Sequence, residues 1–207
     1  MVSIKSSNFC IVLSSPSGAG KTSISKKILF KDKHIKLSVS CTTRPIRKGE
    51  KNNKDYIFIS ETEFKRLVEK NKFLECANVF GFRYGTLKKT INEFFLKKKD
   101  VLFDIDWQGY QQLKQSSLDV IGIFILPPNK KELINRLKKR GRDSKEEMLK
   151  RMSLVKNEIS HFLEYDYIVV NRDIDLCTDQ ILQIIRSERL KRTRLSNLTH
   201  FVNKFID

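Results

Sequence analysis

A run of residues near the start of the chain has the composition of a loop that binds phosphate groups. The run is Ser15-Pro16-Ser17-Gly18-Ala19-Gly20-Lys21-Thr22. It directly follows the apolar stretch 9–13, and consecutive backbone N–H groups in such a loop point at one anion. Lys21 is expected to reach the β- and γ-phosphates of a nucleotide, and the Thr22 hydroxyl is expected to bind Mg²⁺. The run therefore predicts nucleotide-dependent phosphoryl transfer.

The loop departs from the usual G-x-x-x-x-G-K-[ST] pattern, because Ser15 stands where the first glycine is expected. The three remaining specified positions match by chance in roughly one chain in ten of this length. The alternative is a glycine-rich turn that caps an ordinary helix. The apolar stretch before the loop and the helix-compatible segment 23–30 after it favour the phosphate loop, since the motif requires a strand before it and a helix after it.

Strand-like and helix-like segments alternate along most of the chain, which predicts an α/β fold. The expected architecture is a parallel sheet sandwiched by helices, of the P-loop NTPase type. Helix starts are expected at Ser60, Asn129 and Ser144, each with a glutamate three residues later. A long amphipathic helix is expected after Asp173. The expected strands are 9–13, 36–40, 101–105, 120–126 and 167–170.

The 207 residues correspond to one domain by length, and the alternation of strands and helices divides that domain into parts. The pattern breaks between residues 41 and about 99, where β-like pieces at 56–59 and 73–79 surround one expected helix. This is typical of an inserted mixed α/β subdomain. Charged helices around Gly141-Arg142-Asp143 predict a lid. The expected parts are a core at 1–40, 98–135 and 160–192, a nucleoside-monophosphate-binding subdomain at 41–97, a lid at 136–159 and a basic tail at 193–207.

The composition is strongly basic, with a formal net charge of +17. Lysine pairs such as Lys26-Lys27 and Lys138-Lys139 recur on expected helices, which favours solvated helix faces over a specific nucleic-acid site, although a nucleic-acid role stays open. The apolar run 120–126 is too short to cross a bilayer, and no signal peptide is visible. Scattered cysteines and histidines, without metal-site or disulfide spacing, favour a reducing compartment, the cytoplasm.

Four sequence blocks resemble those of guanylate kinases, in their bacterial form, over residues 9–189. The phosphate loop and the lid region 136–151 are two of them. The two most specific blocks are 38–45 with Gly49-Glu50 and Asp55-Tyr56, and Asp104-Ile105-Asp106-Trp107-Gln108-Gly109. The resemblance implies transfer of the γ-phosphate of ATP to GMP, and to dGMP, in purine nucleotide metabolism and GMP recycling. It implies a monomer or homodimer that acts on small molecules and does not associate with a membrane.

The resemblance also implies a GMP site in the inserted subdomain. Arg44 and Arg47 match the family's GMP-phosphate arginines, although an ordinary basic loop is the alternative. The carboxylates of Glu75 and Asp106 complement the N–H donors of guanine, and the alternative for Glu75 is an edge-strand group that faces water. The full expected set is Ser40, Arg44, Arg47, Tyr56, Glu75, Tyr84, Thr86, Asp104 and Asp106; for the two tyrosines, half-buried packing stays open.

On the donor side, the resemblance implies that lid arginines fold over the ATP phosphates. These are Arg136, Arg140 and Arg151, of which the first two share one helix face by their spacing. Asn171 matches a position beside the adenine ring. Asp104 ends an expected strand, as does the acid that supports Mg²⁺ in related nucleotide-binding folds, although a strand-terminal cap is the alternative.

A nucleoside monophosphate carries nearly two negative charges at neutral pH, so its attacking oxygen needs no strong general base. Catalysis must then come from bringing two anions together among arginines, which bind phosphate oxygens with a planar fork. Two other classes of function stay open. A non-catalytic module that binds phosphorylated protein is disfavoured by the intact phosphate loop and lid arginines. A kinase for another nucleoside monophosphate is disfavoured by Glu75 and Asp106.

Overall fold

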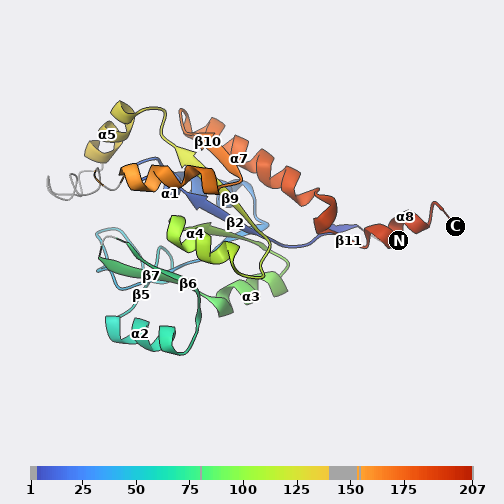
Figure 1. The fold of residues 1–207 in the computed structure, drawn as a ribbon, viewed down its shortest axis with the longest axis horizontal. Helices are drawn as coiled ribbons and strands as arrows, with labels where there is room; N and C mark the ends of the chain where they lie inside the picture. The colour runs from blue at the N-terminus through green and yellow to red at the C-terminus, as the bar shows by residue number, and fades with distance from the viewer. Residues whose placement is uncertain (1–3, 80, 140–152, 154, 207) are drawn as a thin grey trace.

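The computed structural model describes residues 4–79, 81–139, 153 and 155–206 (Figure 1). The expected lid turn Gly141-Arg142-Asp143, the expected helix start at Ser144 and the two lid arginines Arg140 and Arg151 lie outside this part of the chain. Within it, strands and helices alternate much as the sequence predicts.

A five-stranded parallel sheet forms the centre of the molecule, with the order β10-β9-β2-β8-β3. This confirms the predicted α/β class. The strand expected at 36–40 is shorter and begins earlier, because only three residues pair with β8 before the chain leaves the sheet. The strands are β2 (Cys10–Ser14), β3 (Ile35–Leu37), β8 (Asp100–Asp104), β9 (Val120–Leu126) and β10 (Tyr167–Val170).

Helices cover both faces of this sheet, as the near-continuous apolar strands require. On one face, α1 (Lys21–Lys31) and α7 (Ile174–Arg189) pack against Ile11 and Leu13 of β2. On the other face, α3 (Lys88–Leu96) and α4 (Trp107–Lys114) pack against the alternate residues of the same strand. The strand β2 is thus buried on both sides, and it delivers the phosphate loop at its carboxyl end.

A second, four-stranded sheet of order β5-β4-β7-β6 lies below the central sheet in Figure 1. It belongs to the expected inserted subdomain and packs against α2 (Glu61–Glu69), whose N-cap Ser60 accepts a hydrogen bond from the Glu63 N–H as predicted. The expectation of one helix between 41 and 99 is wrong, because α3 also forms there and buries Ile91. The strands are β4 (Cys41–Thr42), β5 (Ile57–Phe58), β6 (Phe73–Val79) and β7 (Phe82–Leu87).

Two further elements lie on the phosphate-loop side of the sheet. Helix α5 (Lys130–Lys139) begins as predicted at Asn129, whose side chain accepts a hydrogen bond from the Glu132 N–H. A helical segment at 155–160 packs Val155 and Ile159 against Leu133 and Leu137 of α5. It leads into the 3₁₀ turn η1 (His161–Glu164), which precedes β10.

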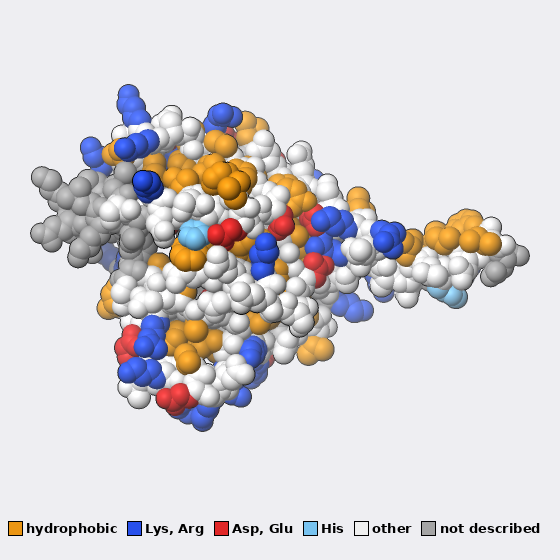
Figure 2. Space-filling model, in the orientation of Figure 1, with side chains coloured by type: hydrophobic (Ala, Val, Ile, Leu, Met, Phe, Trp, Pro, Cys, Tyr) orange, Lys and Arg blue, Asp and Glu red, His pale blue; other side chains and the backbone are white. Residues whose placement is uncertain are grey.

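The tail after residue 193 is ordered into an arm. Strand β1 (Lys5–Ser6) pairs antiparallel with β11 (Leu195–Ser196), and α8 (Leu198–Asn203) extends beyond them (Figure 1). The short turn η2 (Arg192–Arg194) joins the arm to α7. Apolar side chains gather on the arm in Figure 2, while Lys and Arg are spread over the face shown there. None of the described helices is long and apolar enough to span a membrane.

Arg194 ties the arm to the body through a largely buried ion cluster. Its guanidinium donates twice to Asp119, at 2.5 and 2.6 Å, and also to Glu188, which is only 1% exposed. We expect Arg194→Ala to lower the free energy of unfolding by about 3 kcal/mol in urea titrations, because the buried Glu188 carboxylate loses one of its two cationic partners. The exposed neighbour variant Arg192→Ala serves as the control. A loss below about 1 kcal/mol would show that Lys191 and Tyr167, which also contact Glu188, suffice.

Three of the four cysteines are buried among the apolar side chains. Cys10 and Cys177 lie on opposite faces of the central sheet, and Cys41 lies in the core of the second sheet. Cys76 of β6 is partly exposed. All four thiols are free in this structure.

Candidate functional site

The phosphate loop joins the carboxyl end of β2 to the first residue of α1, as the motif requires. Gly18 and Gly20 have φ of +92° and +100°, which side-chain-bearing residues rarely adopt. A Cβ on Gly20 would also lie 2.5 Å from the Asn171 amide nitrogen. Among the described residues, the non-glycine positions with positive φ do not include Ser15. Serine therefore fits at the position where the general pattern has glycine.

Lys21 and Asp104 meet at the carboxyl edge of the central sheet. Asp104 lies opposite Leu13 on the neighbouring strand, and the loop carries Lys21 back over that edge. The Lys21 ammonium lies 2.7 Å from the Asp104 carboxylate and donates to the Ile105 carbonyl at 2.8 Å. Both side chains keep about a fifth of their surface exposed, at 19% and 22%. The pair is thus preorganised yet open to an incoming phosphate.

Residues of neighbouring elements form hydrogen bonds with the backbone of the phosphate loop. The buried Asn171 amide, at the end of β10, donates to the Ala19 carbonyl at 2.7 Å. Arg136 of α5 reaches the carbonyls of Ala19 and Asn171 at 3.4 and 3.1 Å. The Ser17 N–H donates to the Glu158 carboxylate at 3.1 Å. The structure therefore brings Asn171 and Arg136 to the loop backbone, and it adds Glu158, which sequence reasoning missed.

Arg44, which is expected to bind the GMP phosphate, lies just after strand β4 of the second sheet. Its side chain is 6% exposed, and it donates to Glu50 at 2.8 Å and to the Tyr84 hydroxyl at 3.2 Å. The guanidinium lies 5.4 Å from the ring centre of Tyr56, which packs edge-on against Tyr84. Glu50 also accepts a hydrogen bond from the Arg47 N–H at 2.8 Å, whereas the Arg47 side chain is exposed. The two tyrosines thus frame Arg44.

The ion pair between Arg44 and Glu50 shifts the pKa of both groups. Hydrogen bonds from Arg44 and from the Arg47 backbone outweigh the effect of burial and lower the pKa of Glu50. Glu50 and Tyr84 likewise outweigh burial and raise the pKa of Arg44. The arginine therefore stays charged in a confined place, as a phosphate site requires. Sequence reasoning quoted Glu50 within a specific block but assigned it no role; its spacing of six residues from Arg44 was the available signal.

A group of polar side chains lies where the second sheet meets α4. Glu75 and Thr86 are paired across β6 and β7, and Ser40 Oγ lies 3.4 Å from the Thr86 hydroxyl. Glu75 is 3% exposed, so the alternative of a water-facing carboxylate is wrong. One of its oxygens has no hydrogen-bond partner within the described part of the chain, and the other lies beside Gly109. Asp106 is close enough for its charge to act on Glu75, so these four residues, which are expected to bind the base, lie near one another.

Asp106 is the N-cap of α4, with a carboxylate oxygen that accepts from the Gly109 N–H at 3.1 Å. The Gln108 amide donates to its other oxygen at 3.0 Å. Further along α4, Gln112 exchanges hydrogen bonds with both backbone groups of Cys76, at 3.0 and 2.8 Å. Since Cys76 adjoins Glu75, these contacts hold the two carboxylates in place. Sequence reasoning missed Gln112, for which only the helical spacing from Gln108 was a signal.

Burial raises the pKa of Glu75 to about 7, and the nearby Asp106 charge adds to the effect, while Thr86 opposes it. Since this folded-state pKa lies above the ordinary value, ionisation of Glu75 costs stability as pH rises from about 4.5 to about 7. A ligand that donates hydrogen bonds favours the ionised form. We expect KM for a guanine nucleotide to rise about fourfold between about pH 8.5 and about pH 6.5, as the ionised fraction falls. Steady-state kinetics with KM for ATP as the control would measure it; parallel changes in both constants would contradict it.

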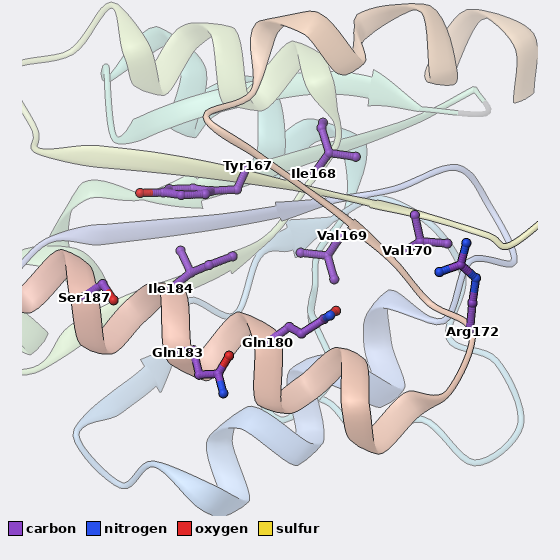
Figure 3. A pocket seen from close by; sticks show the side chains of 9 residues that line it. All are labelled: Tyr167, Ile168, Val169, Val170, Arg172, Gln180, Gln183, Ile184 and Ser187. Carbon is purple, nitrogen blue, oxygen red and sulfur yellow. The ribbon is translucent and has the colours of Figure 1, made fainter.

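A separate hollow of about 520 Å³ lies along the outer edge of the central sheet (Figure 3). It runs between β10 and α7, from Tyr167 to Arg172 on one side and from Gln180 to Ser187 on the other. None of the residues predicted for nucleotide binding lines it. Within the described residues, no cluster of three or more metal-binding side chains occurs.

Known proteins resemble this chain in sequence and in fold. The sequence model of the family described as guanylate kinase matches residues 7–188. The guanylate kinase of Novosphingobium aromaticivorans is 53% identical over 92% of this chain and 87% of its own length, and that of Zymomonas mobilis is 50% identical over 94% and 91%. The crystal structure of guanylate kinase from Anaplasma phagocytophilum superposes with a TM-score of 0.82 at 37% identity, covering 97% of this chain and 96% of that one. The chain belongs to the guanylate kinase family.

Proposed function

We propose that this guanylate kinase transfers the γ-phosphate of ATP to GMP, and also to dGMP, with the residue roles given below. The observation that carries the assignment is the buried, incompletely paired Glu75 carboxylate in the subdomain that also holds Arg44. Guanine offers two adjacent donors, N1–H and the exocyclic amine. Adenine offers no such pair to two carboxylates.

The donor is ATP, held by the loop Ser15–Thr22. Lys21 contacts the phosphates, and its ion pair with Asp104 weakens when they bind. Arg136, Arg140 and Arg151 neutralise charge that develops during transfer. Asn171 acts at the donor site, where its contact with Ala19 supports a role in shaping the loop.

The oxygen-bearing side chains at the ATP site also fit Mg²⁺. Mg²⁺ takes hard oxygen ligands and commonly binds through one or two protein groups together with phosphates and water. Thr22, on the first turn of α1, supplies a hydroxyl, and Asp104 supplies a carboxylate at the neighbouring strand end. Bound with ATP, the ion would neutralise phosphate charge.

The acceptor GMP binds with its phosphate at Arg44 and Arg47, aided by Tyr56 and Tyr84. Its base lies against Ser40, Glu75, Thr86 and Asp106, and Asp104 lies at the junction with the donor. Burial and, after it, the Asp104 charge raise the pKa of Tyr56, so its hydroxyl stays neutral. A neutral Tyr56 hydroxyl can donate a hydrogen bond to a phosphate oxygen.

The chemistry is positioning and charge neutralisation. The GMP phosphate is already largely ionised at neutral pH, so the protein need not remove a proton from it. Arginines on both sides overcome the repulsion between two anions and favour the more dispersed charge of the transition state. Elements that cover the site exclude water, which otherwise competes as an acceptor.

The direct test is ADP formation from ATP with GMP, AMP, UMP or TMP in parallel. We expect GMP to be preferred by at least about 100-fold in kcat/KM over AMP, because AMP leaves the buried Glu75 carboxylate and the partly exposed Asp106 carboxylate without the two guanine donors. Chelation of Mg²⁺ should abolish turnover. Comparable rates with AMP would contradict the assignment of the base-binding residues, and turnover that persists after chelation would contradict the metal's role.

We also propose the domain limits and setting inferred from the sequence. These are a core at 1–40, 98–135 and 160–192, a GMP subdomain at 41–97, a lid at 136–159 and a tail at 193–207. The pairing of β1 with β11 supports treating the tail as an addition to the core. The enzyme is expected in the cytoplasm as a monomer or homodimer, without a specific nucleic-acid partner.

A further inference from the structure

Helix α4 contacts both halves of the proposed site. Its N-cap Asp106 and its side chains Gln108 and Gln112 hold the proposed guanine site and strand β6. A different stripe of the same helix faces the turn η1. It consists of Trp107, Gln111 and Lys114, which are spaced i, i+4 and i+7. The helix therefore joins the GMP subdomain to the elements that border the phosphate loop.

The contact between α4 and η1 is centred on two stacked rings. The Trp107 and His161 ring centres lie 3.6 Å apart, with an angle of 8° between the planes. The Glu164 carboxylate lies 2.5 Å from His161 Nδ1 and accepts from the Gln111 amide at 2.9 Å. The imidazole is thus held by a ring on one face and by a carboxylate at its edge. Such a contact transmits a shift of one element to the other better than a loose apolar contact does.

On its other side, His161 directly follows the helical segment 155–160. That segment places Glu158 against the Ser17 N–H of the phosphate loop and packs Val155 and Ile159 on α5. A continuous series of contacts therefore runs from the loop, through Glu158, to His161, across to Trp107 and into the adjoining Asp106. The series joins the donor site to the acceptor site without crossing the central sheet.

We propose that Trp107 and His161 are positioning residues that couple GMP binding to the donor site; this rests on the proposed role of Asp106 and Glu75 in holding guanine. Guanine bound at Asp106 restrains the amino end of α4. The stacked rings pass this restraint to the segment 155–160 and hence to the contact of Glu158 with the loop. Ordering by one nucleotide lowers the cost of binding the other, which gives positive cooperativity between the two substrates.

Trp107 is the only tryptophan of the chain, so its fluorescence reports this contact directly. GMP affinity is measured by that signal, first alone and then with a saturating non-hydrolysable ATP analogue that has a nitrogen bridge between the β- and γ-phosphates. We expect the analogue to tighten GMP binding at least about fivefold in the unaltered protein. His161→Leu removes the ring and should reduce this enhancement to less than about twofold, while His161→Phe keeps a stacking ring and should retain it.

Leu163 provides the matched control, because it lies in the same turn and is 81% exposed. Leu163→Ala should keep the full enhancement. If His161→Leu fails to fold by circular dichroism, Trp107→Leu read by titration calorimetry takes its place. An enhancement that survives loss of the stacked rings, or that is absent from the unaltered protein, overturns the proposal. Failure of the unaltered protein to bind GMP at all would instead count against the proposed function.

Discussion

Replacing Lys21 by alanine is expected to lower kcat for GDP formation about 10²- to 10³-fold, with little change in the fold. The ammonium lies at the carboxyl edge of the sheet, 2.7 Å from Asp104. In the proposed function, charge on the transferring phosphate develops at this point. Removal of a preorganised charge at such a point raises the barrier far more than it weakens ground-state binding. A coupled assay for ADP measures the rate, and circular dichroism checks the fold.

A second lysine of the same helix supplies the control for Lys21. Lys27 pairs with Asp175 at 2.5 Å on the surface, with 40% of its side chain exposed. Lys27→Ala removes the same charge from α1 but should leave kcat unchanged, because exposed ion pairs contribute little and this one lies away from the loop. A rate within tenfold of the unaltered enzyme for Lys21→Ala would contradict the role of the loop lysine.

Glu75→Gln is expected to raise KM for GMP about 10- to 100-fold, with KM for ATP changed less than about twofold. The substitution keeps the size of the side chain but replaces one acceptor oxygen with an N–H₂ donor, which faces the donors of guanine. It also removes the ionisable group whose pKa burial raises to about 7. The dependence of KM for GMP on pH in this range should therefore flatten in the variant.

An exposed acid in the same subdomain provides the comparison for Glu75. Glu69 ends α2 and points to solvent, so Glu69→Gln changes the charge equally but should leave both Michaelis constants unchanged. Steady-state kinetics with each substrate varied in turn separates the two effects. An equal loss of ATP and GMP affinity in Glu75→Gln would assign Glu75 a structural role in place of guanine binding.

The central sheet and the phosphate loop were predictable because their signals are local. Five apolar segments and one glycine-rich run suffice to place β2, the loop and α1 in order. Strand β7 was harder to predict, because Gly85 interrupts its run of strand-forming residues. That glycine is required by a contact remote in sequence: a Cβ there would lie 2.9 Å from the ring of Phe73.

Among the site residues too, those with a local sequence signal were predicted, and those that depend on partners distant in sequence were missed. Arg44 was predicted through one of the short blocks that resemble the family, whereas Glu75 lies outside those blocks and was predicted because a carboxylate complements the donors of guanine. Glu158 was missed because its partner is a backbone N–H 141 residues away, which leaves no pattern in the sequence. The ordered arm was missed for the same reason, as β1 and β11 pair across nearly the whole chain.

Burial of the cysteines has a practical consequence for chemical labelling. Desolvation raises the pKa of Cys10 to about 12 and the pKa values of Cys41 and Cys177 to about 11. Only the thiolate attacks maleimides, disulfides or peroxides, so these three groups are inert near neutral pH. Replacement of the partly exposed Cys76 alone should give a nearly silent background, on which one engineered surface thiol can carry a fluorophore.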